Sequence, residues 1–395
     1  MSTPTTHRTA PLWKFAEVSP STPEFDDLTE SDEVTFIPLE DVWPANKADD
    51  FQTVAWEKRL TGYTPFRRGD LLLPKVTPTV THGRTMITDT ATELGVASTE
   101  VYTVRARPGT DPRWLAYLLV GTEFLGLAGA SVQGTGGLKR ISTQFVESYP
   151  LPDASPDEQR AIADYLDRET AEVDAMSADL DEMEALLTER RNAGFSRALN
   201  RARNLGVAVP NVRVKFLCDI GTGYGDTQDA TEDGEYPFYV RSNNILRSSG
   251  WDIEGPAVLT AGDGAGVGKV FHYAEGRMKV HQRVYALTNF RSVNPRYFFE
   301  AFIRIFPDTV LYGGASSTVA SLRMHMLADL ELPLPPLDEQ RRIAAEIDRE
   351  TAEIDAMLAD IVELRDLLAE RRSAVIAAAV TGQIDVPDTQ EINNG

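Results

Sequence analysis

The sequence is poor in the side chains that build metal sites and redox centres. Among its 395 residues Cys218 is the only cysteine, and the five histidines are scattered without the spacing of zinc ligands. The sequence therefore predicts no disulfide, no thiolate cluster and no bound metal. No apolar run approaches the ~18 residues of a membrane helix, and residues 1–13 lack the basic start and apolar stretch of a secretory signal. These absences predict a cytoplasmic protein with no membrane partner.

Positive charge is also scarce. The chain has 39 Lys and Arg against 60 Asp and Glu, for a formal net charge of −21. Nucleic-acid-binding proteins normally use a basic surface, so this balance argues against a simple electrostatic grip by the whole chain. The charge is uneven, however, since residues 269–304 hold seven Lys and Arg and only two acids. Local positive surfaces can therefore exist on an acidic whole.

Catalytic motifs are missing or broken. GDGAGVGKV at Gly262–Val270 fails as a phosphate-binding loop, because Asp263 stands where the first glycine belongs and Val270 replaces Ser or Thr. We interpret it as a Gly-rich turn. DPRW at 111–114 and NPRY at 294–297 resemble the Asn/Asp-Pro-Pro-aromatic motif of amino-methyltransferases, but Arg breaks both, and their place fits a helix N-terminus better. With no nucleophile–base pair visible, we predict that the chain itself catalyses nothing and binds no cofactor.

The sequence does contain a long internal repeat. DEQRAIADYLDRETAEVDAMSADLDEMEALLTERR at 157–191 recurs 181 residues later as DEQRRIAAEIDRETAEIDAMLADIVELRDLLAERR at 338–372, and 23 of the 35 positions are identical. Both copies have apolar residues at the a and d positions of a heptad, and each seam is interrupted by a glutamate, Glu169 or Glu350. The seam residues are Ile162, Leu166, Val173, Met176, Leu180, Met183 and Leu187 in the first copy, and Ile343, Ile347, Ile354, Met357, Ile361, Leu364 and Leu368 in the second.

This pattern predicts two long helices of ~50 Å each. Ser155 to Glu158 has the spacing of a capping box with proline at the first helical position. Each helix needs a partner for its seam, and the best partner is the other copy, which predicts an antiparallel coiled coil. The alternative is one core helix in each of two unrelated domains, which the long identity disfavours.

The segments before the two helices also repeat one another, with the same order of strands, helix and loop but fewer identical residues. Tyr102 parallels Tyr285, Pro112 parallels Pro295, and Gly69-Asp70 is matched to Gly262-Asp263. Short strands are expected at 34–39, 70–76 and 100–106 in the first globule and at 235–245 and 283–288 in the second. Each globule then has an amphipathic helix starting at Pro112 or Pro295, followed by a Gly-rich loop at 131–142 or 313–323.

The predicted fold class is therefore α+β: two tandem globules, each followed by a long helix, with the two helices paired as an antiparallel coiled coil. The globules have diverged far more than the helices, which suggests one shared task for the helices and two different tasks for the globules. The predicted domains are a disordered tail at 1–10, the first globule at 11–152, the first helix region at 153–203, the second globule at 204–335, the second helix region at 336–384, and a disordered tail at 385–395.

LPLPPLDEQRRIAAEID at 332–348 and LPDASPDEQRAIADYLD at 151–167, in the order globule–helix–globule–helix, resemble the specificity subunits of type I restriction–modification systems. The resemblance implies that each globule is a target-recognition domain, which reads one half of a split asymmetric target in double-stranded DNA. It implies that the helices set the spacer and dock two methylation subunits, which bring S-adenosylmethionine and methylate adenine. It also implies that nuclease–translocase subunits can join in a restricting complex.

Base readout requires hydrogen-bond donors and acceptors on loops that reach a groove. By that criterion the predicted DNA-binding residues of the first globule are Lys75, Thr77, Thr79, His82, Arg84, Gln133, Thr135, Lys139 and Arg140. Those of the second are Arg241, Asn243, Asn244, Lys269, His281, Gln282, Arg283, Ser316, Ser317 and Thr318. Each could instead be a solvated loop residue. Two other functions remain open: an acidic coiled-coil scaffold without DNA recognition, and a methyltransferase or nuclease, against which the broken motifs weigh.

Overall fold

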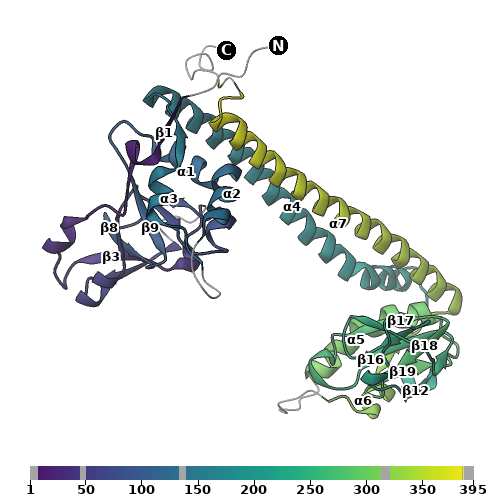
Figure 1. Cartoon of the computed structure of the whole chain (residues 1–395). Coiled ribbons are helices and arrows are strands. Elements are labelled where there is room, and N and C mark those ends of the chain that lie inside the picture. The colour runs from purple at the N-terminus through teal and green to yellow at the C-terminus, as the bar shows by residue number, and fades with distance from the viewer. Residues whose placement is uncertain (1–7, 45–49, 133–138, 313–320, 385, 387–395) are drawn as a thin grey trace. The chain divides into compact units, whose positions relative to one another are not determined.

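The computed structural model describes residues 8–44, 50–132, 139–312, 321–384 and 386. Its contacts divide the chain into two compact units, one of Met1–Asp181 with Val362–Gly395 and the other of Glu182–Ile361. Each unit holds one globule and a stretch of both long helices (Figure 1). The domain boundaries expected from the sequence stay predictions.

The first globule is built on two four-stranded sheets and a short ribbon. One sheet has the order β2 (Ala16–Val18), β9 (Val101–Ala106), β6 (Leu71–Pro74), β7 (Met86–Ile87). The other has the order β4 (Gln52–Ala55), β3 (Glu33–Ile37), β8 (Leu94–Ala97), β5 (Thr64–Arg67), in which β3 and β8 are parallel. The ribbon pairs β1 (Thr9–Pro11) with β10 (Pro150–Pro152), directly before the first long helix.

The second globule repeats this topology strand for strand. Its sheets have the orders β12 (Asp219–Thr222), β19 (Val284–Thr288), β16 (Ala257–Ala261), β17 (Phe271–Ala274) and β14 (Ile245–Ser248), β13 (Tyr236–Tyr239), β18 (Arg277–Val280), β15 (Ile253–Glu254). The single parallel pair recurs as β13 with β18, and the ribbon recurs as β11 (Asn211–Arg213) with β20 (Glu331–Pro333). The duplication inferred from the sequence is therefore a duplication of fold.

The helices of the globules are α1 (Pro112–Val120), α2 (Thr122–Ser131) and α3 (Thr143–Ser148) in the first, and α5 (Pro295–Tyr312) and α6 (Met324–Ala328) in the second. The one helix expected from Pro112 is two, bent by 60°. The break is at Gly121, whose backbone is extended at φ −65 and ψ 146. Both pieces turn apolar residues inward, with Trp114 and Phe124 fully buried.

The two long helices are α4 (Pro156–Asn204) and α7 (Leu337–Val380). The predicted capping box is confirmed, because the Ser155 hydroxyl accepts the N–H of Glu158 at 3.3 Å and the Glu158 carboxylate accepts the N–H of Ser155 at 2.7 Å. Both helices continue beyond the repeated segment. Each extension places apolar residues in a core: Phe195, Ala198 and Leu199 of α4 pack in the second, and Ile376, Ala379 and Val380 of α7 pack in the first.

The helices pair antiparallel, as predicted (Figure 1). Ion pairs join them: Arg371–Glu169 (3.2 Å) and Arg372–Asp174 in the first unit, and Arg190–Glu350 (2.7 Å) and Arg191–Asp355 in the second. Adding 181 to a residue of α4 gives its equivalent in α7, so the two sets are the same pairs with the helices exchanged. Each seam glutamate is thus explained by an arginine of the opposite helix.

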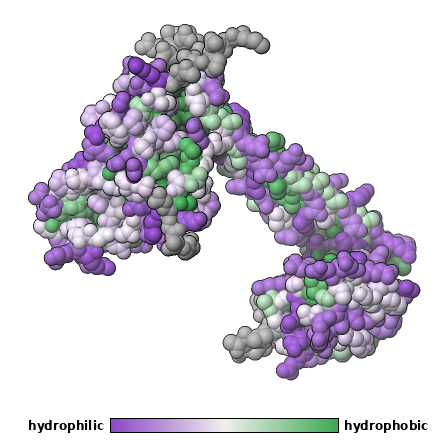
Figure 2. All heavy atoms as spheres, viewed as in Figure 1, coloured by the Kyte–Doolittle hydropathy of each residue, from purple (hydrophilic) through white to green (hydrophobic). Residues whose placement is uncertain are grey.

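Only one line of the predicted seam is well covered. Leu166, Val173, Leu187, Ile343, Ile347, Ile354 and Ile361 are buried, while Ile162, Leu180 and Leu368 are half-buried. By contrast Met176, Met183, Met357 and Leu364 are 43%, 51%, 45% and 46% exposed. These four therefore do not lie in a closed seam between the two helices. Figure 2 shows apolar surface along the helices.

Candidate nucleic-acid interface

Both globules bring the same two segments together, one after the central strand β6 or β16 and one at the end of the Gly-rich loop. In the first globule the N–H of Ile141 donates to the carbonyl of Lys75 at 2.9 Å, and in the second the N–H of Leu322 donates to the carbonyl of Gly262 at 2.8 Å. A tyrosine hydroxyl holds each loop end: Tyr102 donates to the carbonyl of Ile141 at 3.0 Å, and Tyr285 to that of Leu322 at 3.3 Å. The predicted equivalence of the two tyrosines is confirmed.

Strand register corrects one predicted equivalence. Leu73 lies opposite Tyr102 and Thr260 lies opposite Tyr285, so Gly262-Asp263 corresponds to Lys75-Val76 and not to Gly69-Asp70. The bridges Val76–Arg140 and Asp263–Ser321 agree with this register. The equivalence predicted from the two Gly-Asp pairs is wrong because Asp70 precedes strand β6, whereas Asp263 follows strand β16. Asp70 is instead buried and paired with Arg105 at 2.7 Å.

In the first globule the structure brings four of the predicted residues together. Thr77 donates its N–H to the carbonyl of Lys139 at 2.9 Å, and Arg140 pairs with Glu100 at 2.6 Å. Lys75 donates to the carbonyl of Thr99 at 2.9 Å, and burial lowers the pKa of its ammonium group.

The remaining predicted residues of this globule are arranged differently. Thr79 precedes the short 3-10 helix η6 (Val80–His82), and His82 ends it and is exposed. Arg84 donates to the carbonyls of Leu39 (2.8 Å) and Val42 (3.0 Å), and its guanidinium lies 4.2 Å over the ring of Trp43. Arg84 thus already holds a neighbouring loop. Gln133 and Thr135 lie outside the described residues.

In the second globule a carboxylate joins two of the predicted arginines. Asp263 accepts from Arg241 at 2.6 Å through Oδ1 and from Arg283 at 3.2 Å through Oδ2. Burial opposes ionisation of Asp263, but the hydrogen bond and charge of Arg241 together with Arg283 bring its pKa below the ordinary value. The side chains of Arg241 and Arg283 are 43% and 58% exposed. Asp263 therefore contacts both guanidinium groups while a large part of each side chain remains accessible to solvent.

The Gly-rich turn makes this arrangement possible. A Cβ on Gly266 would lie 2.6 Å from the carbonyl oxygen of Arg241, and one on Gly262 would lie 2.9 Å from that of Arg283. Both approaches require glycine, and Gly264 between them has a positive φ of 78°. The turn forms η9 (Gly264–Gly266) and leads to strand β17, which supports the interpretation as a turn and not a phosphate-binding loop.

Arg241 and Asp263 line a cleft of about 410 Å³, and the other lining residues are Thr227, Val240, Ser242, Leu246, Gly264, Ala265, Gly266 and His281. His281 accepts the N–H of Arg283 on Nδ1 at 3.0 Å, so its neutral tautomer carries the proton on Nε2, 3.5 Å from the hydroxyl of Thr227. Burial, and then the charge of Arg241, lower the pKa of His281. The cleft therefore offers guanidinium, hydroxyl and imidazole N–H donors.

Asp263, Thr227 and Ser242 line this cleft but are not among the residues predicted from the sequence. Asp263 follows Gly262 and Ser242 follows Arg241 in the sequence, whereas Thr227 has no such neighbour. Of the other predicted residues, Gln282 donates to Asp226 at 3.1 Å, and Asn243, Asn244 and Lys269 are exposed. Ser316, Ser317 and Thr318 lie outside the described residues.

Within the described ranges, no group of three or more His, Cys, Asp or Glu side chains is arranged to hold a metal ion. In the same ranges no single helix is long and apolar enough to cross a membrane; the bent pair α1–α2 passes that test only when both helices are taken together.

Known proteins resemble this chain in sequence and in fold. Residues 209–363 match the model of the type I restriction modification DNA specificity domain. A chain from the structure described as "Structural basis underlying complex assembly and conformational transition of the type I R-M system" has a TM-score of 0.71 at 18% identity, covering 97% of this chain and 100% of that one. The HsdS subunit from Thermoanaerobacter tengcongensis has a TM-score of 0.57 at 18% identity, with 96% and 98% covered. At this identity the likeness shows the fold, and the predicted fold class is confirmed.

A curated relative is similar to part of the chain. The type I restriction enzyme EcoDI specificity subunit of Escherichia coli is 26% identical over 193 residues, which are 49% of this chain and 42% of that protein. The matched part thus spans less than half the length of this relative. The resemblance to the specificity subunits of type I restriction–modification systems is confirmed by the match at 209–363 and by the likeness to this relative.

Proposed function

We propose that this chain is the DNA sequence-recognition subunit of a type I restriction–modification complex, in which each globule reads one half of a split asymmetric target in double-stranded DNA. The observation that carries the proposal is a shared scaffold with different side chains on it. The tyrosine-held loop pair recurs in both globules, but Lys75-Val76 of one is Gly262-Asp263 in the other. Two globules with one backbone and two polar surfaces suit the reading of two different sequences.

In the second globule we assign base readout to Arg241 and Arg283. Arginine reads guanine by donating two hydrogen bonds to its O6 and N7 edge. Asp263 occupies one side of each guanidinium and restricts its rotation, which lowers the entropy lost on binding. We therefore expect a guanine in the half-site read by residues 204–335.

The test is sequencing of methylated adenines after co-expression of the chain with its methylation subunits. The variant Arg283→Ala should weaken binding to the target by ~1–3 kcal/mol and relax selection for guanine at one position of one half-site. The other half-site should be unchanged. Lys269→Ala, also an exposed cation of this globule, is the matched control and should lower binding without changing the selected sequence. If this chain changes neither the presence nor the sequence of methylation although a complex forms, the proposed function is wrong.

We further propose that the long helices set the spacer and dock two methylation subunits. The exposed apolar side chains Met176, Met183, Met357 and Leu364, together with Leu186 and Leu367, are left uncovered by the pairing of the two helices. Protein surfaces of this kind usually have a protein partner. S-adenosylmethionine and the methylation chemistry then belong to those subunits, the present chain is non-catalytic, and nuclease–translocase subunits join for restriction.

The acidic scaffold without DNA recognition is not favoured. It accounts for the charge of −21, but it gives no reason for a DNA specificity domain at 209–363.

A further inference from the structure

The glutamine of the repeated DEQ motif is buried in both copies, with Gln159 2% and Gln340 1% exposed. A buried amide is costly unless both of its ends form hydrogen bonds. Gln159 accepts the N–H of Asp111 at 3.0 Å and donates to the carbonyl of Ala154 at 2.8 Å. Each glutamine therefore ties two segments of backbone together.

The second copy forms the same bridge. Gln340 accepts the N–H of Asn294 at 2.8 Å and donates to the carbonyl of Pro335 at 2.7 Å. Asp111 and Asn294 precede the first turn of α1 and α5, and Ala154 and Pro335 lie just before α4 and α7. In both units the glutamine thus joins the start of a globule's helix to the start of the long helix.

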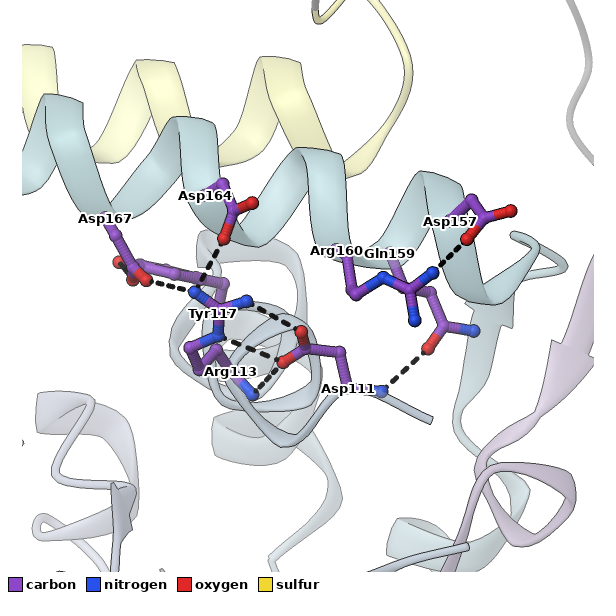
Figure 3. Close-up of polar contacts among 8 residues, drawn as sticks. All are labelled: Asp111, Arg113, Tyr117, Asp157, Gln159, Arg160, Asp164 and Asp167. Carbon is purple, nitrogen blue, oxygen red and sulfur yellow. Dashed lines mark hydrogen bonds and ion pairs between the residues drawn. The ribbon is translucent and has the colours of Figure 1, made fainter. Parts of the chain in front are cut away.

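An arginine forms a second contact between the same elements. Arg113 of α1 pairs with Asp164 (2.8 Å) and Asp167 (2.7 Å) of α4, and also with Asp111 (2.8 Å), as Figure 3 shows. Arg296 of α5 pairs with Asp348 of α7 at 2.7 Å. Asp348 is the repeat equivalent of Asp167. The arginine that breaks the methyltransferase-like motif in DPRW and NPRY thus has a structural partner in each copy.

We propose that these contacts form two clamps that fix the angle of each globule on its own long helix, and that this angle determines which spacer lengths the protein accepts between its half-sites. The first clamp is Asp111, Arg113, Gln159 and Asp167; the second is Asn294, Arg296, Gln340 and Asp348. The inference rests on the proposed function, and it makes these groups positioning residues that need not touch DNA.

The geometry explains why two contacts are needed. Gln159 and Asp167 are eight residues apart, which is ~12 Å along a helix. The long helices already pack in each core through apolar residues, and two polar contacts that far apart along the helix add a constraint on the direction of the globule. One added base pair moves a half-site by ~3.4 Å along the DNA and turns it by about a tenth of a helical turn. A pivoting globule can follow that displacement, and a clamped one cannot.

The experiment uses the whole chain assembled with its methylation subunits. DNA substrates carry the two mapped half-sites separated by the native spacer or by one base pair more or fewer, and the methylation rate on each is measured. The variants are Arg113→Ala and Arg296→Ala, with Arg113→Lys as the conservative replacement. Arg160→Ala is the matched control, since Arg160 lies on α4 beside the first clamp but pairs with Asp157 of its own helix (Figure 3). Asp164→Ala is a mild variant, because the second copy already has Ala345 at the equivalent place.

In Arg113→Ala and in Arg296→Ala we expect the methylation rate on altered spacers, relative to the native spacer, to rise about tenfold. This rise is equivalent to ~1.4 kcal/mol of lost discrimination. Both half-site sequences should still be required. Arg113→Lys and Asp164→Ala should give smaller rises, and Arg160→Ala should behave as the wild type. An unchanged spacer ratio in an assembled Arg296→Ala complex, or in Arg113→Lys if Arg113→Ala does not fold, overturns the clamp. If the wild-type complex methylates no split target, the proposed function fails instead.

Discussion

At the scale of single residues, two histidines of the second globule are kept neutral by their surroundings. Burial lowers the pKa of His272, although its Nε2 donates to the carbonyl of Ser242 at 3.2 Å, which acts in the opposite direction. Burial and the charge of Arg241 lower the pKa of His281, which also faces Arg283, Asp226 and Asp263. The neutral form of each imidazole is therefore part of the folded arrangement around the cleft.

This arrangement predicts acid sensitivity above the range of the carboxylates. An unfolded histidine has a pKa of ~6.5. Because the folded pKa values are lower, the unfolded chain binds more protons as the pH falls through ~6.5, and stability decreases there. We expect the thermal midpoint of the whole chain to fall between pH 7.5 and 5.5. The fall should be smaller in His272→Gln and unchanged in His82→Gln, which alters an exposed histidine. Equal falls in all three proteins would contradict the assignment.

The sequence identified the residues around the cleft only singly. Arg241, His281 and Arg283 could be chosen because they are donors in Gly- and Asn-containing loops. Their meeting at Asp263 could not be foreseen, because it depends on the register of β16 against β19 and on two glycines that let backbones approach closely. Local composition carries no information on either.

At the scale of elements, the heptad repeat predicted both helices and their antiparallel pairing because its period is local. It could not say which apolar line would be covered, since that depends on how many helices pack together. The pattern also left Glu169 and Glu350 as anomalies. Glu350 is only 17% exposed and accepts from both Arg190 and Arg197, so it is a partly buried acid with its partners supplied by the other helix.

We expect this interaction to be measurable as a coupling. Glu350→Arg should destabilise the chain, because it places a third cation beside Arg190 and Arg197, and Arg190→Glu in the same chain should recover about 1 kcal/mol of the loss. The measurement is a double-mutant cycle from denaturant unfolding of the second unit's transition. The exchange of Asp338 and Arg341, an exposed pair within α7, is the control and should show a coupling close to zero. Strictly additive effects at Glu350 and Arg190 would show that the pair does not contribute.

At the scale of the whole molecule, each half of the chain holds everything that the pairing of helices needs. α7 alone carries Glu350, Asp355, Arg371 and Arg372, which include both the acids and the bases of the interhelical pairs. The apolar ends are equivalent as well. Ile376, Ala379 and Val380 of α7 are the repeat equivalents of Phe195, Ala198 and Leu199 of α4, which fill the second core. Two copies of the second half could therefore satisfy one another.

We predict that residues 204–395 alone form a two-fold symmetric dimer that, with methylation subunits, selects a palindromic split target. Its weak point is the core position of Phe195, where the partner's Ile376 leaves space beside Tyr297. Ile376→Phe should therefore stabilise the half-chain dimer by ~1 kcal/mol or more, by filling a cavity. In the intact chain the same substitution overpacks the first core, where Ile376 is 6% exposed, and should destabilise it. Light scattering measures the mass of the dimer. Thermal unfolding measures whether Ile376→Phe stabilises the half-chain dimer and destabilises the intact chain. A monomeric half-chain, or the same sign in both proteins, would contradict the exchange of equivalent helices.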